Sequence, residues 1–357
     1  MSEPQKLRTG VLGCGQIAQA AHFEACRKAR NVELYAVCDL AEDLLAQMAA
    51  IHHPRKTFTD YDAMLADPEI DAVIIAIADQ FHVPMALKAI AAGKHVLVEK
   101  PLGVNIEECE ELRDRVHESG LILQVGTMKR FDPGIEFARD FIRDEMGEML
   151  ALRTWYCDST YRYTMTDAIQ PLIISSANAK RPAGDPKANK TRYYLLGHGS
   201  HLLDTARFLG GEITAVRAKL VEKFGAYCWW IDTEFASGAA GHLDLTIAVR
   251  MDWWEGFHVY GEHGSVLGKI HNPWYFKTAE VECFSSRDGK FHRELGADAH
   301  FYRRQVEGFA DTILTGAPMR GATVDDGLAA IRGVVAIARS VETGERVELA
   351  GVSGEPA

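Results

Sequence analysis

An alternation of short β-branched runs with amphipathic helical stretches over the first 127 residues constrains the fold most. Strands that alternate with helices predict βαβ units and a parallel, doubly wound sheet. The run at residues 72–78 is apolar without alternation, as expected for a strand covered on both faces. Predicted strands lie at residues 8–13, 32–39, 72–78, 95–99 and 121–125, and predicted helices lie at 16–29, 42–50, 83–92 and from Asn105 onward. Asn105 starts its helix with Glu108 three residues on as a capping-box partner.

After residue 127 the pattern changes to consecutive strand-like runs, crowded between residues 213 and 283. Runs of strands followed by helices predict an α+β domain with an antiparallel or mixed sheet. We therefore expect an α/β protein of two domains, residues 1–127 and 128–357, and allow for the last helix packing back on the first domain. Further helices are predicted near residues 133–144, 200–209, 300–315 and 324–341, and a strand near 149–157.

Composition excludes several classes of function. The 357 residues include 39 Lys and Arg against 50 Asp and Glu, a net charge of -11, so no nucleic-acid partner is expected. A membrane-spanning helix needs about 20 apolar residues and no such run exists, so we expect no membrane partner. Residues 1–7 are polar and lack the apolar core of a signal peptide. The seven scattered cysteines include no C-x-x-C pair and indicate a reducing compartment, so we expect a cytoplasmic protein.

A glycine-rich turn lies between the first predicted strand and helix. Residues 13–18 read Gly-Cys-Gly-Gln-Ile-Ala, which fits the G-x-G-x-x-A fingerprint of dinucleotide-binding folds. Gly13 permits the tight turn, and Gly15 lets the backbone approach a pyrophosphate at the helix N-terminus. The alternative is a glycine turn in a βαβ protein that binds no nucleotide. The residues expected to hold the cofactor here are Gly13, Gly15, Gln16 and Ile17.

Asp39 ends the second predicted strand, 21 residues after Ala18. An acid at this place binds the ribose hydroxyls of the adenosine. Leu40 and Ala41 follow, and no Arg stands beside Asp39 to receive a 2′-phosphate. The sequence therefore favours NAD over NADP.

Lys100 follows the predicted strand at residues 95–99. It would emerge at the carboxyl end of a parallel strand, the edge where such folds bind ligands. Pro101 restricts the backbone of Lys100 and so fixes the ammonium more firmly than in an ordinary loop. From the spacing alone, a solvated Glu99–Lys100 charge pair at a strand end is an equal alternative.

These features together resemble the Gfo/Idh/MocA family, the relatives of glucose–fructose oxidoreductase and inositol dehydrogenase. The resemblance lies in the glycine turn, Asp39, residues 74–82 and residues 92–102, and extends through 126–133 and 201–210. It implies an N-terminal Rossmann domain and a C-terminal α/β domain with a large open, mostly antiparallel sheet. That sheet often serves as an oligomer interface in the family, so we expect a homo-oligomer, a dimer or tetramer, formed through it.

The family pattern also implies cofactor-binding residues. It implies a catalytic lysine at Lys100, commonly with a cis peptide to Pro101. Residues 77–79 read Ile-Ala-Asp where the family usually has Thr-Pro-Asn, so the cofactor contacts there depart from the pattern. The resemblance places the remaining cofactor contacts at Ala78, Asp79, His82, Glu99 and Lys100.

Family members usually carry Asp-x-x-x-His on the helix that opens the active site of the second domain. His201 matches the histidine, but Gly197 stands where the aspartate is expected. His198 and Asp204 each lie three residues from His201, so helical geometry places them near one face and either could replace the missing carboxylate. The residues expected to bind substrate are Lys100, Arg130, Tyr156, His198 and His201, with Arg130 and Tyr156 taken from their family positions.

His198-x-x-His201 also has the spacing of a metal site, with Asp204 as a third ligand. The family chemistry uses no metal, and no further His or Cys cluster lies nearby in the sequence. We therefore expect no metal. Other aromatic side chains around the polar segment 158–192, among them Tyr161 and Tyr163, suit the C–H faces of pyranoses, but for any single one a place in the core or a subunit interface is favoured.

NAD-dependent oxidation of a secondary hydroxyl fits these parts. An imidazole with an ordinary pKa of about 6.5 makes His201 a natural general base, and Lys100 would stabilise the alkoxide. The expected function is a dehydrogenase or reductase acting on a sugar or polyol. Two alternatives stay open: a glycoside-cleaving enzyme that retains NAD and works by transient oxidation and elimination, and a non-catalytic NAD-binding regulatory protein.

Overall fold

The computed structural model describes residues 5–159, 173–180, 187–296 and 300–356. The chain folds into two compact units. The first unit comprises Met1–Met128, Gln170–Ala188 and His300–Leu328; the second comprises Lys129–Ile169, Asn189–Ala299 and Ala329–Ala357. Each unit therefore contains segments that are distant in the sequence.

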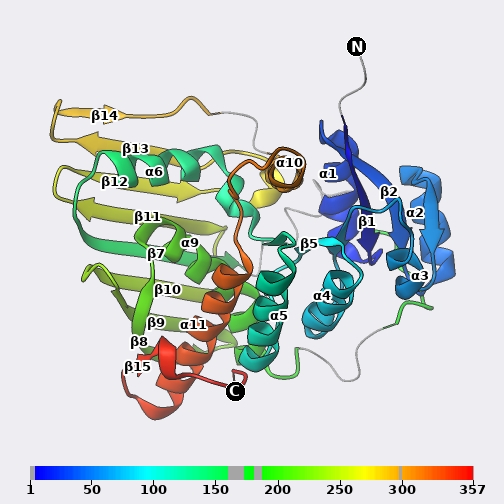
Figure 1. Cartoon of the computed structure of the whole chain (residues 1–357). Helices are drawn as coiled ribbons and strands as arrows, with labels where there is room; N and C mark the ends of the chain where they lie inside the picture. Colours follow the sequence, from blue (N-terminus) through cyan, green and yellow to red (C-terminus); the bar gives the residue numbers. More distant parts are fainter. Residues whose placement is uncertain (1–4, 160–172, 181–186, 297–299, 357) are drawn as a thin grey trace. The chain divides into compact units, whose positions relative to one another are not determined.

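The first unit is built on a six-stranded sheet in which every strand pair is parallel, in the order β3-β2-β1-β4-β5-β6 (Figure 1). The chain winds outward in both directions from β1, so a topological switch point lies between β1 and β4. The central strand β4 is fully buried, as the unbroken apolar run predicts. The strands are β1 Leu7–Leu12, β2 Val32–Cys38, β3 Lys56–Phe58, β4 Ala72–Ile75, β5 His95–Val98 and β6 Leu123–Val125.

Helices connect these strands and cover the sheet. Asn105 caps α5, its side chain accepting from the backbone N–H of Glu108, as the capping pattern predicts. A late helix of the chain, α10 (Phe301–Thr315), contacts α1, β1 and β2. The other helices are α1 Phe23–Lys28, α2 Glu42–His52, α3 Tyr61–Leu65, α4 His82–Ala91 and α5 Ile106–Ser119.

Three local features differ from the sequence-based expectation. The strand predicted at residues 72–78 ends at Ile75, because the chain turns there into the 3-10 helix Asp79–Phe81. Strand β3 has no predicted counterpart, since its side chains are largely exposed and give no apolar pattern. The helix predicted at residues 16–29 contains a π-helical turn, Ala18–His22, before α1.

The second unit is built on a nine-stranded sheet in the order β14-β13-β12-β11-β7-β10-β9-β8-β15. Among the described strands of this sheet, only β7 and β10 pair in parallel, so the sheet is mixed and mostly antiparallel. Both parts of the predicted fold class are thereby confirmed. The strands are β7 Met149–Ser159, β8 Ile213–Lys223, β9 Ala226–Phe235, β10 Ala240–Val249, β11 Trp254–Gly261, β12 Gly264–Ile270, β13 Glu280–Ser285, β14 Lys290–His292 and β15 Val347–Glu348.

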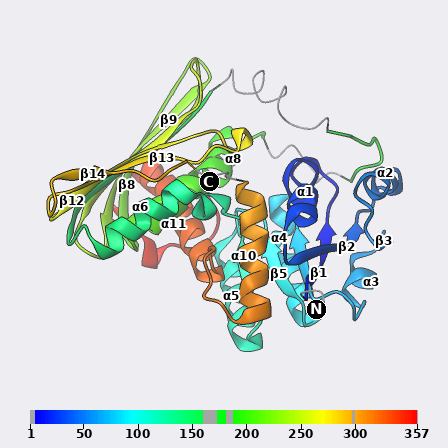
Figure 2. The same cartoon turned by 90° about the horizontal axis from the view of Figure 1, so that it is seen from above.

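Helices α6 (Pro133–Asp144), α9 (Ser200–Gly210) and α11 (Val324–Thr343) lie on one face of this sheet (Figures 1 and 2). Along β9 the residues alternate accordingly, with Trp229 buried against the helices and Trp230 half exposed on the other face. A short α8 (Lys190–Tyr194) and a second π-helical turn, Leu195–Gly199, precede α9. Within the described parts of the chain, no helix is both long and apolar enough to cross a lipid bilayer.

Candidate functional site

The glycine turn follows β1 at the carboxyl edge of the first unit's sheet. Gly13 has a φ of +102°, a conformation that side chains other than glycine rarely adopt. A Cβ at this residue would lie 2.6 Å from the carbonyl oxygen of Ala76 and 2.7 Å from the Ile77 side chain. Around Gly15, by contrast, no atom of the described residues lies within 4 Å of where a Cβ would be. The first glycine is therefore required by the turn, and the second leaves open space for a ligand to approach the backbone.

Gln16 and Ile17 begin the helical segment that follows this turn, with Gln16 exposed and Ile17 half buried. The first N–H groups of a helix have no partner within it and favour a negatively charged group. A diphosphate fits this donor set, because open space at Gly15 lies directly before the helix.

Asp39 follows β2 at the same edge. One carboxylate oxygen accepts from the backbone N–H of Cys14 at 2.7 Å, and the other accepts from the N–H of Ala41 at 2.8 Å. The two bonds fix the carboxylate beside the glycine turn while the side chain stays partly exposed. Leu40 next to it is 63% exposed and carries no charge that would attract a phosphate.

The third loop of this edge follows β4 and contains Ala78, Asp79 and His82. The first two are half buried, whereas His82 is completely enclosed. Its ring nitrogens lie 2.6 Å from the carbonyl oxygen of Pro101 and 3.0 Å from that of Ile77. The imidazole thus ties the loop after β4 to the loop after β5.

Lys100 stands directly after β5, joined to Pro101 by a cis peptide bond, as the family resemblance implies. Its backbone N–H donates to Glu99 Oε2 at 3.2 Å. The other oxygen of Glu99 lies 2.8 Å from Nε2 of His22, on the π-helical turn. Glu99 is buried, whereas Lys100 is half buried.

A segment from later in the chain, residues 173–180, also packs on this edge. The Gln19 side-chain amide donates to the carbonyl oxygens of Cys14 and Ile174, both at 2.8 Å, and its oxygen accepts from the N–H of Ile174 at 2.9 Å. The Ser176 hydroxyl lies 2.7 and 2.8 Å from the carboxylate oxygens of Asp43, at the start of α2. The segment therefore bridges the glycine turn and the loop after β2.

In the second unit, a cluster of rings surrounds Tyr156 on β7. The His201 imidazole stacks parallel to the phenol at 6.1 Å between centroids, and the His198 ring meets it edge-on at 5.5 Å. Trp253 contacts another edge at 5.0 Å. The Lys129 ammonium lies 4.4 Å from the ring centroid, within the range of a cation–π interaction. Tyr156, His198 and His201, all expected to bind substrate, are thus brought together.

The carboxylates of Asp158 on β7 and Asp204 on α9 lie in the region of these histidines. Nε2 of His198 lies 3.0 Å from Asp158 at the end of β7. Asp204 does not orient His201, because its carboxylate is bound by the guanidinium of Arg130, with nitrogen–oxygen distances of 2.7 to 3.1 Å. Among the described residues, no atom lies within 4 Å of a Cβ at Gly197, the position where the family aspartate is expected. The carboxylate that pairs with His198 comes from β7 instead.

Two charged residues of this cluster, Lys129 and Glu255, are not among the site residues expected from the sequence. Lys129 forms an ion pair with Glu255, and both side chains are less than a tenth exposed. Burial raises the pKa of the Glu255 carboxyl, and the charge of Lys129 opposes that shift. An acid between Trp254 and Gly256 in an aromatic strand is the sequence signal that could have marked Glu255. Tyr161 and Tyr163 lie outside the described residues.

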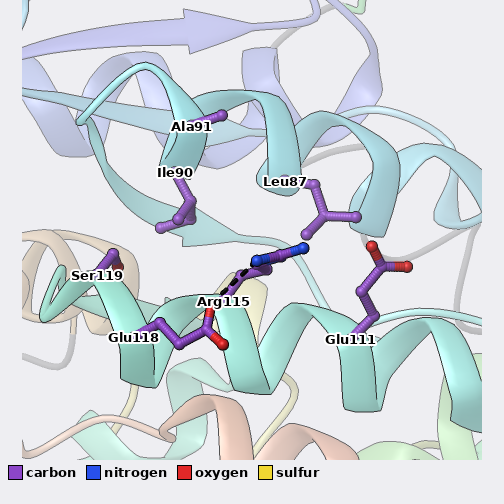
Figure 3. Close-up of a pocket in the computed structure, with 7 residues that line it drawn as sticks. All are labelled: Leu87, Ile90, Ala91, Glu111, Arg115, Glu118 and Ser119. Atoms are coloured by element: carbon purple, nitrogen blue, oxygen red, sulfur yellow. Dashed lines mark hydrogen bonds and ion pairs between the residues drawn. The ribbon is translucent and has the colours of Figure 1, made fainter.

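A surface hollow of ≈ 550 Å³ in the first unit lies elsewhere (Figure 3). It is lined by the carboxyl-terminal half of α4 and by α5 from Glu111 to Ser119, and helices in a βαβ sheet run opposite to the strands. The hollow therefore lies at the sheet edge opposite Gly13 and Lys100. Arg115 and Glu118 in it pair with each other at 3.0 Å. Over the described residues, no group of three His, Cys, Asp or Glu side chains is placed to hold a metal ion.

Comparison with known proteins gives consistent matches. Residues 7–127 match the profile of Gfo/Idh/MocA, described as an oxidoreductase family with an NAD-binding Rossmann fold, and residues 186–349 match the family's C-terminal alpha/beta domain. Inositol 2-dehydrogenase 2 of Saccharopolyspora erythraea is 30% identical, covering 95% of this chain and 94% of that protein. Myo-inositol 2-dehydrogenase of Thermotoga maritima is 25% identical, covering 98% and 100%. The crystal structure of an NAD-binding oxidoreductase from Klebsiella pneumoniae superposes with a TM-score of 0.80 at 22% identity, covering 96% and 99%.

Proposed function

Since the chain belongs to the Gfo/Idh/MocA oxidoreductase family, we propose that it transfers hydride between NAD and a secondary hydroxyl of a cyclic polyol or sugar. The observation that carries this proposal is the meeting of three features at one edge of the first sheet. The Gly13 turn, the Asp39 carboxylate and Lys100 follow β1, β2 and β5 there. The names of the inositol dehydrogenase relatives support the substrate class.

The cofactor is bound, on this proposal, by the backbone N–H groups of residues 15–17 at its diphosphate and by Asp39 at its adenosine ribose. The loop with Ala78, Asp79 and His82 and the stretch Glu99–Lys100 complete the binding edge. NAD is preferred over NADP because the Asp39 carboxylate would repel a 2′-phosphate, and its neighbour Leu40 supplies no compensating cation. The nicotinamide, when bound, accepts or supplies the hydride.

Proton transfer falls to two side chains. Lys100 donates to the substrate oxygen and stabilises its developing negative charge. His201, stacked on Tyr156, takes the hydroxyl proton, since imidazole exchanges protons near neutral pH. Further hydroxyls of the substrate are bound by Tyr156 and by His198, which Asp158 orients. Arg130 fixes the position of α9, the helix that carries His201, through its ion pair with Asp204.

A second candidate function is a glycoside-cleaving enzyme that keeps its NAD through each cycle. The observation that favours it is that residues 173–180 are held beside the turn proposed to bind the cofactor. Gln19 bonds to the backbone of Ile174, and Asp43 accepts from the Ser176 hydroxyl. A segment held there would slow release of the dinucleotide.

A panel of inositols, pyranoses and their glycosides, assayed with NAD and NADP side by side, tests the function. We expect net NADH formation, followed by absorbance, with at least one cyclic polyol or sugar, and a higher kcat/KM with NAD than with NADP. Glycoside cleavage without net NADH, together with a dinucleotide that persists through gel filtration, would instead establish the second candidate. NAD binding without turnover on any substrate would contradict both.

Lys100→Ala tests the proton-transfer proposal. Loss of one preorganised donor to a developing alkoxide should lower kcat by about 100- to 1000-fold. NADH affinity, measured by fluorescence titration, should change little, because the backbone of the turn is untouched. Lys88→Ala on α4, where the ammonium pairs with Asp62 at the surface, is the matched control and should keep full activity. Full turnover by Lys100→Ala would reject the assigned role.

We also propose a homodimer or homotetramer formed through the nine-stranded sheet. Trp230 and Trp254 are 54% and 44% exposed on strands whose buried neighbours face the helices, and exposed aromatic patches mark interaction surfaces. Sedimentation velocity should give a multiple of the 39.5 kDa chain mass. The double change Trp230→Glu and Trp254→Glu should give monomers, whereas Ile51→Glu on α2 should not. A monomeric wild-type protein at micromolar concentration would contradict this.

A further inference from the structure

We propose that His22 is a positioning residue for Lys100, acting through the buried carboxylate of Glu99; this inference rests on the proposed function. His22 touches no reacting atom in this scheme. It fixes the carboxylate that in turn fixes the main chain from which the Lys100 side chain extends.

The Glu99 carboxylate joins two segments that are 77 residues apart in the sequence. Oε1 lies 2.8 Å from Nε2 of His22, and Oε2 accepts the backbone N–H of Lys100 at 3.2 Å. Gly126, directly after the neighbouring strand β6, has no side chain and so leaves room for the Glu99 carboxylate. A Cβ at this residue would lie only 3.1 Å from Oε1 and from the Cα of Glu99. The carboxylate is thus held in one place by a hydrogen bond on each oxygen and by close packing.

This arrangement keeps a charge inside the protein. Burial of Glu99 would raise the pKa of its carboxyl, but the hydrogen bond and charge of His22, with the charges of Lys100 and His82, outweigh burial and lower it. Removing one partner of a buried pair leaves the other uncompensated. Without His22, the Glu99 carboxylate would therefore either move toward solvent or take up a proton, and both change its bond to Lys100.

The π-helical turn sets the direction in which His22 points. The backbone N–H of Phe23 bonds to the carbonyl of Ala18, five residues back, instead of four as in an α-helix. The turn therefore takes up one additional residue between Gln16 and α1, which rotates every later side chain about the helix axis. Isolated π turns occur often at functional sites. Here the turn joins the helix start proposed to hold the diphosphate to the histidine that holds Glu99.

Tyr302 on α10 also packs against His22 and helps to bury it. The His22 side chain has no exposed surface, and the Tyr302 ring meets it edge-on at 5.9 Å. Burial raises the pKa of the Tyr302 phenol well above its usual value, with the charge of Glu99 adding to the effect. Tyr302 thus stays neutral at physiological pH, and Glu99 is the anion that faces His22 among the described residues.

His22→Gln and His22→Leu test the inference as a matched pair. The glutamine amide can still donate to Glu99, whereas leucine fills the space without a donor. We expect His22→Leu to lower kcat by about 100-fold, the effect of displacing a catalytic group by about 1 Å. NADH affinity should stay within about threefold, and His22→Gln should recover most of kcat. His52→Leu controls for loss of a nearly buried histidine of the same unit that packs on Phe23.

Glu99→Gln keeps the test valid if His22→Leu fails to fold. It preserves shape but removes the charge, so kcat should fall by a larger factor than NADH affinity, since Glu99 also lies at the proposed cofactor edge. Full kcat in either folded variant, equal losses in His22→Leu and His22→Gln, or a loss of NADH affinity in proportion to kcat would overturn the inference. If Lys100→Ala is fully active, the proposed function fails as well; if Lys100→Ala is inactive and His22→Leu is fully active, only the positioning role fails.

Discussion

The backbone turn at Gly13 is the constraint on which the rest of the first unit depends. A positive φ and a carbonyl oxygen 2.6 Å from any Cβ leave glycine as the residue that fits. Because the chain can reverse there within two residues, the following helix starts at the carboxyl edge of the sheet with its N–H groups directed outward. Asp39 braces the same turn through the Cys14 N–H. On the proposed function, binding of a dinucleotide and packing of the βαβ unit therefore use the same atoms.

Buried charges organise both units. In the first, Glu99 connects the helix after the glycine turn with Lys100. In the second, the Lys129 ammonium pairs with Glu255 and lies against the Tyr156 ring. Arg130 and Asp204 form another buried pair in this unit. Buried pairs contribute little net stability compared with apolar packing, but breaking one is costly. Such pairs specify where a side chain must be, which is what a catalytic surface requires.

Two π-helical turns, one in each unit, share a local arrangement. Each precedes an α-helix, and each carries a histidine that pairs with a carboxylate from a strand end: His22 with Glu99 and His198 with Asp158. An additional residue in a turn leaves no mark in the apolar pattern of a helix. The sequence therefore predicts a helix at residues 16–29 but not the rotation that brings His22 to Glu99.

How well a feature can be predicted depends on how far apart in the sequence its residues lie. The parallel sheet, the glycine turn and the cap at Asn105 depend on residues close in the sequence, and the structure confirms them. Family membership, indicated by the run through Lys100 and Pro101, is likewise established. The Lys129–Glu255 pair joins residues 126 apart, and the exposed strand β3 has no apolar pattern. Local patterns contain no information about either.

Calorimetric titration of NAD into the cofactor-free protein tests the central claim most directly, because it measures binding at the glycine turn independently of any substrate. The account predicts a single binding isotherm with about one dinucleotide per chain. The absence of heat with NAD, repeated with NADP, would contradict it, since the turn would then serve the fold alone.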